Sequence, residues 1–294
     1  MAHILLNPKT RAIVQGITGK VGQAQTRWML EAGTPIVAGV TPGKGGQVIE
    51  GLPVYDTVGE AVDRSQATAS VIFVPAGTAR QAAFEAIDAH LELVVIITET
   101  IPIRDTLEIK FRAHLSGTRV IGPNCPGILV PGIGKLGIMP QNIFTPGSMG
   151  VVGRSATLSY EVIANLTAAG LGQTAAIGIG GDPVVCTEFT DVLRLFEEDP
   201  DTQGVALIGE IGGTAEERAV DQIRLMRKPV VAFIAGRSAP PGRRFGHAGA
   251  IVRAGSGRSE HKIMVLKEAG VTIAETPAEI PALLKQRLAW VKMA

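Results

Sequence analysis

The chain has few aromatic residues and few cysteines, and each shortage limits what it can be. Phe, Trp and Tyr together make up 4% of its 294 residues, although hydrophobic residues in total reach 46%. Ala, Val, Ile and Leu therefore supply the apolar surface, which is typical of buried parallel strands and the helices that cover them. The only cysteines are Cys125 and Cys186, too few for a disulfide framework.

Strong net charge and long apolar runs are also missing. The formal net charge is +1, which gives no electrostatic reason to expect a nucleic-acid or anionic-membrane partner. No uninterrupted apolar segment is long enough to span a bilayer, and residues 1–9 do not resemble a signal peptide. We therefore expect a globular protein of the cytoplasm, or of the mitochondrial matrix in a eukaryote.

Short β-branched runs alternate with longer helix-like segments in both halves of the chain, which predicts right-handed βαβ units and mainly parallel sheets. A region rich in Gly and Pro, residues 122–150, interrupts the alternation. The fold class is therefore α/β, with two domains joined near residues 125–145. The predicted strands are residues 12–15, 35–40, 70–74, 93–98 and 119–122 in the first half, and 150–153, 175–178, 205–208, 229–235 and 271–273 in the second.

A glycine-rich turn, residues 16–22 (GITGKVG), follows the first predicted strand and opens a helix. Glycines there let a phosphate approach the backbone, and the helix N-terminus supplies unpaired N–H donors. The spacing differs from that of dinucleotide sites, and the second strand ends without the acidic residue that holds a ribose hydroxyl. Lys44 follows instead, and suits a phosphorylated ribose, as in coenzyme A or NADP. Residues 97–99 (Ile-Thr-Glu) end a later strand, at the edge where such sheets bind ligands.

Three further motifs follow predicted strands in the second half. Ser155, in GRSAT (residues 153–157), is a plausible helix N-cap and could also cradle a phosphoryl group. A glycine cluster ends in Asp182, and Glu210 lies among glycines after an apolar strand. A carboxylate in that position can orient a histidine and stabilise its charged form. Together these motifs predict a site that handles phosphoryl groups.

His247 is the most informative residue of the chain. Its neighbours between Arg243 and Ala250 include glycines and alanines that leave the imidazole accessible. Neutral imidazole is nucleophilic near physiological pH, and an N–P bond to it stores a phosphoryl group without trapping it. We therefore predict His247 to be the group that is transiently phosphorylated.

The motifs occur, in the same order, in a known family. Residues 41–46 (TPGKGG), 122–127 (GPNCPG), 178–183 (GIGGDP), 208–213 (IGEIGG) and 246–250 (GHAGA) make the chain similar to the α subunit of succinyl-CoA synthetase, over essentially its whole length. The resemblance implies a Rossmann-like CoA-binding domain, residues 1–125. A flavodoxin-like ligase domain, residues 126–294, would then carry the phosphohistidine loop.

The resemblance also implies a role for each matching residue. His247 would be the phosphohistidine, with Glu210 bonded to its ring. Where the family usually has Gly beside Ser155, this chain has Ala156, so the resemblance does not fix the identity of the carboxylic acid substrate. The residues implied to hold coenzyme A are Thr18, Gly19, Lys20, Val21, Lys44, Ile97, Thr98 and Glu99. Those implied to contact the phosphate or the acid are Ser155, Ala156, Thr157 and Tyr160.

The family works with a β subunit that carries an ATP-grasp nucleotide site, as a heterodimer or heterotetramer. Mg²⁺ would accompany ATP or GTP on that partner, so we expect no metal ligand in this chain. In the CoA-forming direction, phosphorylated His247 would pass its phosphoryl group to a small carboxylic acid, and the CoA thiolate would displace phosphate from the acyl phosphate.

Other functions remain open at this point. The acid could be malate or citrate, as in malate–CoA ligase or citryl-CoA synthetase. A CoA-binding sensor without catalysis would need neither His247 nor Glu210. An NADP-dependent oxidoreductase explains the first glycine-rich turn but leaves the second half without a purpose. Cys125 could be a nucleophile, but the prolines beside it favour a rigid turn.

Overall fold

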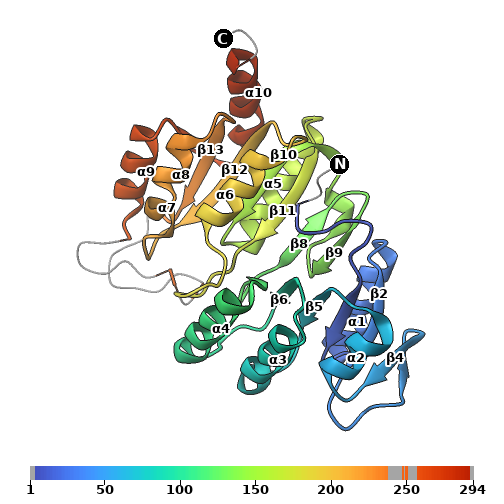
Figure 1. The fold of residues 1–294 in the computed structure, drawn as a ribbon. Coiled ribbons are helices and arrows are strands. Elements are labelled where there is room, and N and C mark those ends of the chain that lie inside the picture. Colours follow the sequence, from blue (N-terminus) through green and yellow to red (C-terminus); the bar gives the residue numbers. More distant parts are fainter. Residues whose placement is uncertain (1–3, 238–246, 248, 251–256, 292–294) are drawn as a thin grey trace. The chain divides into compact units, whose positions relative to one another are not determined.

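The computed structural model describes residues 4–237, 247, 249–250 and 257–291, and the chain forms two compact units (Figure 1). The N-terminal unit comprises Leu5–Met139 together with Val184–Thr187. Among the described residues, the C-terminal unit comprises Ile4, Pro140–Pro183 and those from Glu188 onward. The division between residues 125 and 126 stays a prediction.

The sheet of the N-terminal unit has a topological switch point at its first strand. Strand β1 pairs in parallel with β2 on one side and with β5 on the other. Where the connections from two neighbouring strands lead to opposite sides, a crevice opens at the carboxyl ends of these strands. Ligands of such sheets bind in that crevice. The strand order is β3 (Val48–Ile49), β4 (Leu52–Tyr55), β2 (Ile36–Val40), β1 (Ala12–Gln15), β5 (Ala69–Ile72), β6 (Leu93–Ile96) and β7 (Arg119–Ile121), parallel except for β3–β4.

Four helices accompany this sheet: α1 (Lys20–Glu31), α2 (Val58–Ser65), α3 (Ala76–Asp88) and α4 (Ile103–Ser116). Helix α3 contacts both α2 and α4. The three helices bury a core of small and branched residues against the strands, including Ala61, Ala83 and Ile109. Helix α1 instead contacts β1, β2 and β9.

Part of the segment that the sequence suggested as a linker folds as an antiparallel hairpin of β8 (Gly127–Val130) and β9 (Gly134–Gly137). The two strands approach so closely at Gly127 that a Cβ there would overlap the Leu136 carbonyl oxygen. Glycine is therefore needed in a strand here, although glycine usually indicates a turn.

The sheet of the C-terminal unit has a second switch point. Strand β10, the first of its βαβ series, lies between β11 and β12, and every neighbouring pair in the series is parallel. This is the strand order of flavodoxin-like folds, whose ligands bind between the first and third strands. The series runs β14 (Thr272–Ile273), β13 (Val230–Ala235), β12 (Gly204–Glu210), β10 (Pro146–Gly153) and β11 (Gln173–Gly178). The predicted α/β class with mainly parallel sheets is confirmed.

The helices of this unit form two contacting groups, as expected when right-handed crossovers place helices on both faces of a parallel sheet. Helices α5 and α10 contact each other, and α6, α7, α8 and α9 form the other group. Their bounds are α5 (Ala156–Ala168), α6 (Phe189–Glu198), α7 (Ala215–Arg218), α8 (Val220–Leu225), α9 (Ser259–Glu268) and α10 (Ile280–Val291), with 3-10 turns at η1 (Gln141–Ile143) and η2 (Pro277–Glu279).

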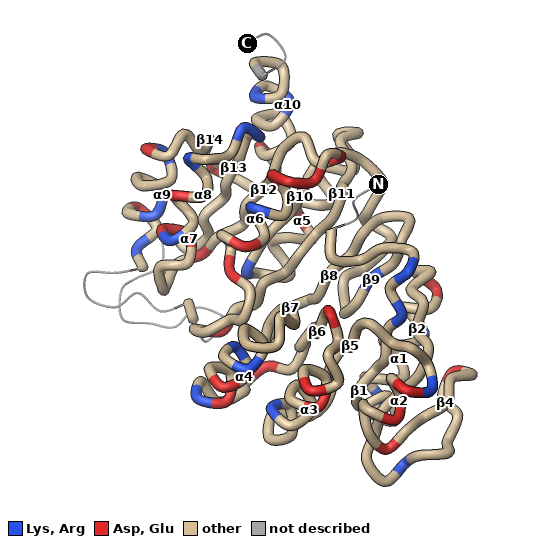
Figure 2. The backbone as a smooth tube through the Cα atoms, in the orientation of Figure 1, with Lys and Arg blue, Asp and Glu red and all other residues tan. Residues whose placement is uncertain are grey.

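Figure 2 shows basic and acidic positions interspersed along the helices of both units. Within the described part of the chain, no helix combines the length and the apolar character needed to cross a membrane.

Candidate active site

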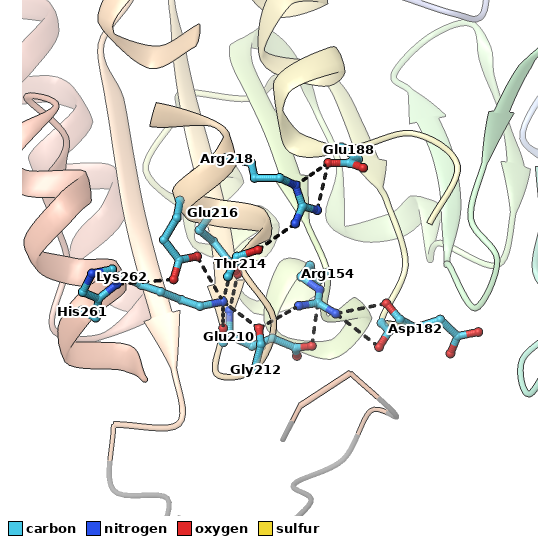
Figure 3. A network of polar contacts seen from close by, with 12 residues as sticks. Arg154, Asp182, Glu188, Glu210, Gly212, Thr214, Glu216, Arg218, His261 and Lys262 are labelled. Carbon is cyan, nitrogen blue, oxygen red and sulfur yellow. Dashed lines mark hydrogen bonds and ion pairs between the residues drawn. The ribbon is translucent and has the colours of Figure 1, made fainter. Parts of the chain in front are cut away.

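The predicted phosphoryl-handling residues follow the strands at the switch point of the C-terminal unit. Glu210 is the last residue of β12, and Arg154 comes directly after β10. Gly181 and Asp182 lie in the loop after β11. Because the carboxyl ends of parallel strands meet at one edge, side chains distant in sequence converge here (Figure 3).

His247 and Glu210 form the central pair of this site. The imidazole Nδ1 lies 2.9 Å from Glu210 Oε2, and the two side chains are 29% and 8% exposed. An ionised carboxylate only accepts hydrogen bonds, so Nδ1 carries the proton and donates it. In the neutral ring the lone pair is then on Nε2, the nitrogen able to attack an electrophile. The other described residues of the predicted loop are Gly249 and Ala250; Arg243 lies outside the described residues.

The hydrogen bond that His247 donates to Glu210 raises the pKa of His247 above its ordinary value, against the opposing effect of burial. The charge of Arg154 lowers this pKa, and that of Asp182 raises it. A carboxylate so close favours the positively charged ring, which is also the charge that an imidazole develops on its way to a phosphohistidine.

Because the pKa of His247 is raised on folding, its charged form stabilises the fold below the unfolded pKa, near 6.5. That contribution disappears as pH rises through the folded pKa. The difference in unfolding free energy between wild type and His247→Asn should therefore be larger at about pH 5.5 than at about pH 9. Urea unfolding across this range measures it, and a pH-independent difference would contradict the assigned charge interaction.

Arg154 is the residue of the site whose role the sequence did not reveal. It is buried, and its Nε lies 3.6 Å from Glu210 Oε1. One terminal nitrogen, Nη2, donates to the carbonyl of Asp182 at 3.2 Å, and Nη1 lies 3.4 Å from the carbonyl of Gly212. Arg154 therefore compensates the Glu210 charge and joins the loops after β11 and β12. Its only sequence signal was its position before the predicted cap.

Two glycines are required by the seating of the histidine loop. A Cβ on Gly181 would overlap the His247 ring. The Gly249 N–H donates to the Gly181 carbonyl at 3.1 Å, and a Cβ on Gly249 would collide with Arg154. The glycines of both motifs thus allow His247 and Gly249 to lie directly on the loop after β11.

The predicted phosphate cradle lies at the start of α5. Ser155 caps this helix as expected, its Oγ accepting from the Leu158 N–H at 3.4 Å and lying 3.5 Å from Thr157 Oγ1. Ala156 begins the helix, and Tyr160 is half-buried in the next turn. The N-terminus of α5 adds positive electrostatic potential at the edge of the sheet that holds Glu210.

Sequence analysis also missed two buried charged residues that contact the main chain of Glu210. Lys262 on α9 and Glu216 on α7 are both 0% exposed and form an ion pair. The sequence offered only the helical spacing of Lys262 with the buried residues Ser259 and Leu266, which becomes informative only once the helix register is known.

The predicted CoA-binding turn lines a cavity in the N-terminal unit. The cavity has a volume of about 550 Å³, within the usual range for small-molecule sites. Thr18, Gly19, Lys20 and Val21 all line it, at the start of α1. The N-cap is Gly19, which brings no side chain to the first-turn N–H groups, so those donors remain available to an anion.

The remaining CoA-binding candidates do not line this cavity. Lys44 lies on the loop that brings Thr41 and Pro42 to it, and Asp56 holds that loop by accepting from the Gly45 N–H at 2.8 Å. Residues Ile97, Thr98 and Glu99 follow β6. Thr98 Oγ1 donates at 2.6 Å to the carbonyl of Val74, itself a cavity residue.

Cys125 lies in the N-terminal unit and is buried, its Sγ 3.2 Å from the Ile96 carbonyl. Burial raises the pKa of this thiol to about 12. A thiol that stays protonated at neutral pH is a poor nucleophile, so the structure favours the turn role over the catalytic one. Among the described residues, no group of three His, Cys, Asp or Glu side chains could hold a metal ion.

Comparison with known proteins agrees with the two units. Residues 7–100 match the model of the CoA binding domain, and residues 152–272 match that of the CoA-ligase family. The α subunit of ADP-forming succinate–CoA ligase from Methanothermobacter thermautotrophicus is 57% identical over 277 residues, 94% of each chain. The chain belongs to the succinate–CoA ligase α-subunit family. The same subunit of Staphylococcus aureus (strain Mu50) is 52% identical over 96% of this chain and 93% of that one.

The resemblance inferred from the motifs is thereby confirmed. The fold of the family is also found in the ATP citrate lyase of Methanothrix soehngenii, solved in complex with citrate and coenzyme A, with a TM-score of 0.87 at 23% identity. This chain is covered to 99% but spans only 51% of that lyase chain, so the likeness concerns the fold of the matching part.

Proposed function

We propose that this chain is the α subunit of an ADP- or GDP-forming succinate–CoA ligase. The enzyme joins succinate and coenzyme A at the cost of ATP or GTP, and His247 carries the phosphoryl group between steps. The observation that carries the proposal is the 2.9 Å contact between His247 Nδ1 and the buried Glu210 carboxylate, at the switch point of the ligase domain.

The residues of the chain support each proton and charge requirement of that reaction. Glu210 holds the proton on Nδ1, so the Nε2 lone pair would attack the γ-phosphorus of the nucleotide. The N–P bond would form at Nε2 as the bond from phosphorus to the departing ADP or GDP breaks. Phosphorylation makes the ring cationic, and the Glu210 carboxylate stabilises that charge. The phosphoryl group then passes from Nε2 to a carboxylate oxygen of the acid. Attack of the CoA thiolate on the acyl carbon expels phosphate.

The cavity of the N-terminal unit fits the phosphates of coenzyme A. Gly16 and Gly22 leave the backbone bare beside it, and the first turn of α1 offers its N–H groups. The match of residues 7–100 to a CoA binding domain favours coenzyme A over NADP. Lys44 would pair with the 3′-phosphate, and Ile97, Thr98 and Glu99 would contact the remainder of the molecule.

The nucleotide and its Mg²⁺ would be bound by a β subunit of the ATP-grasp type, in a heterodimer or heterotetramer. Ser155, Ala156, Thr157 and Tyr160 would then contact the phosphoryl group and the acid. The cytoplasm, or the mitochondrial matrix in a eukaryote, remains the predicted location.

The deciding experiment is nucleotide-dependent CoA-thioester formation by this chain with its β partner. Succinate, malate and citrate are compared side by side with ATP and with GTP. We expect succinyl-CoA as the dominant product and a phosphorylated intermediate on His247. Thioester formation from malate or citrate alone would replace succinate, and CoA binding without any thioester would favour the sensor function.

Lys44→Ala should weaken the binding of coenzyme A by about 1–3 kcal/mol, because a charge-assisted phosphate contact is lost. Binding of dephospho-CoA, which lacks the 3′-phosphate, should be unchanged. Isothermal titration of both ligands measures this, with Lys9→Ala, an exposed lysine of the same unit, as the control. Equal weakening for both ligands would mean that Lys44 contacts a part of coenzyme A other than the 3′-phosphate.

A further inference from the structure

The ion pair of Lys262 and Glu216 is fully enclosed within the C-terminal unit. Both side chains are 0% exposed, although they come from two different helices, α9 and α7. Glu217 Oε2 lies 3.9 Å from the same ammonium and is itself 15% exposed. Charges so placed lose their hydration and need several well-aligned partners.

The pair holds the main chain of Glu210 at both of its polar groups. Glu216 Oε1 accepts from the Glu210 N–H at 3.0 Å, while Lys262 Nζ donates to the Glu210 carbonyl at 2.9 Å. Lys262 also donates to the Gly212 carbonyl at 2.8 Å, an oxygen that Arg154 Nη1 approaches at 3.4 Å. Figure 3 shows these contacts converging on the end of β12.

This arrangement fixes the residue from which the catalytic carboxylate projects. The strand ladder stops at Glu210, and glycines at 212 and 213, with φ of 88° and 60°, follow almost at once. A strand end followed by glycines has many accessible conformations. The ammonium and carboxylate select one of them, in which Glu210 Oε2 reaches His247 Nδ1.

Stability alone does not explain a buried ion pair. Apolar residues of similar volume usually stabilise a protein as well or better, because they avoid the loss of hydration. An apolar pair, however, offers neither an acceptor to the Glu210 N–H nor a donor to its carbonyl.

We propose that Lys262 and Glu216 are positioning residues of the active site, which hold the Glu210 backbone so that its carboxylate keeps His247 in the reactive tautomer. The inference rests on the proposed function and names two further residues on which that function depends. Neither residue touches the phosphoryl group; both act through Glu210.

The test is the double variant Lys262→Met/Glu216→Leu, which removes both charges while roughly keeping side-chain volume. We expect it to fold, because the two buried charges are removed together, but with a lower unfolding free energy than the wild type, because the Glu210 N–H and carbonyl lose their partners. Turnover with the β subunit should fall about tenfold to a hundredfold, because the carboxylate is misplaced, with little change in the KM for coenzyme A. The imidazole NMR titration of His247 should move to lower pH, since the ring loses its aligned acceptor.

Three comparisons complete the design. Lys267→Met makes the same chemical change at an exposed position of α9 and should leave all readouts unchanged. Glu216→Gln, nearly isosteric, leaves the buried Lys262 ammonium without its main counter-charge, so it should lower the unfolding free energy and shift the His247 titration in the same direction. Lys262→Arg keeps a charged donor beside Glu216 and should retain more turnover than the double variant.

Wild-type turnover and an unshifted His247 titration in a folded double variant would overturn the inference. So would unfolding of both the double variant and the charge-conserving Lys262→Arg, since a purely structural role then suffices. Failure of the proposed function looks different: the wild-type complex would form no thioester, while the NMR titration of the intact chain would still report on the Glu210–His247 contact.

Discussion

Replacing His247 with Asn is expected to lower thioester formation by about 10⁴-fold or more, because the phosphoryl group loses the nucleophile that would carry it from the nucleotide to the acid. Asparagine can still donate a hydrogen bond toward Glu210, so the loop after β12 should keep its structure. Coupled assay of the complex with the β subunit measures turnover, and labelling with γ-³²P nucleotide should show no phosphorylated chain.

The binding of coenzyme A should survive this substitution, because the cavity proposed to hold it is lined by residues of the N-terminal unit alone. His261→Asn is the matched control, since this histidine is 58% exposed on α9 of the same unit as His247. Normal turnover by the His247 variant would refute the phosphohistidine mechanism, and the His261 control should keep its turnover.

Gly22→Ala is expected to destabilise the N-terminal unit by about 1–3 kcal/mol, because the added methyl group would overlap the Gly16 carbonyl oxygen. The start of α1 must then move away from the end of β1. Since Thr18 to Val21 line the cavity there, the affinity for coenzyme A should fall about tenfold or more. Chemical denaturation and calorimetric titration measure the two effects.

Gly59→Ala is the control, because it adds a methyl group to α2 of the same unit with no heavy atom within 4 Å. Replacing an exposed helical glycine with alanine usually stabilises the protein by up to about 1 kcal/mol. The change in unfolding free energy should therefore be negative for Gly22→Ala and positive for Gly59→Ala. A stabilised Gly22→Ala protein with normal CoA binding would show that α1 adapts without disturbing the cavity.

The sheets were predictable where strands are apolar and β-branched. All ten strands expected from the sequence are present, and β12 and β13 follow the predicted segments closely. The pattern failed where strands are short or rich in glycine, as in β3 and in the β8–β9 hairpin. There the close approach of two backbones, at Gly127 for example, decides the structure, and that contact joins residues apart in sequence.

The candidate site was predictable to the extent that motifs follow strands. Ser155, Glu210 and His247 were expected together, and the structure brings Glu210 and His247 into contact. Lys262 and Glu216 escaped because a single charged residue on a helix normally faces solvent. Their burial depends on how α7 and α9 pack, which no local pattern records.

The enclosed pair of Lys262 and Glu216 also constrains how this protein can evolve. The two positions are 46 residues apart, so one mutation rarely changes both. Losing either partner alone leaves an uncompensated charge in the interior, which costs about 3–5 kcal/mol, a large part of the stability of an ordinary domain. We expect the lysine and the glutamate to be inherited together in lineages that keep the histidine chemistry. In a related protein that no longer catalyses the reaction, both positions should be substituted together.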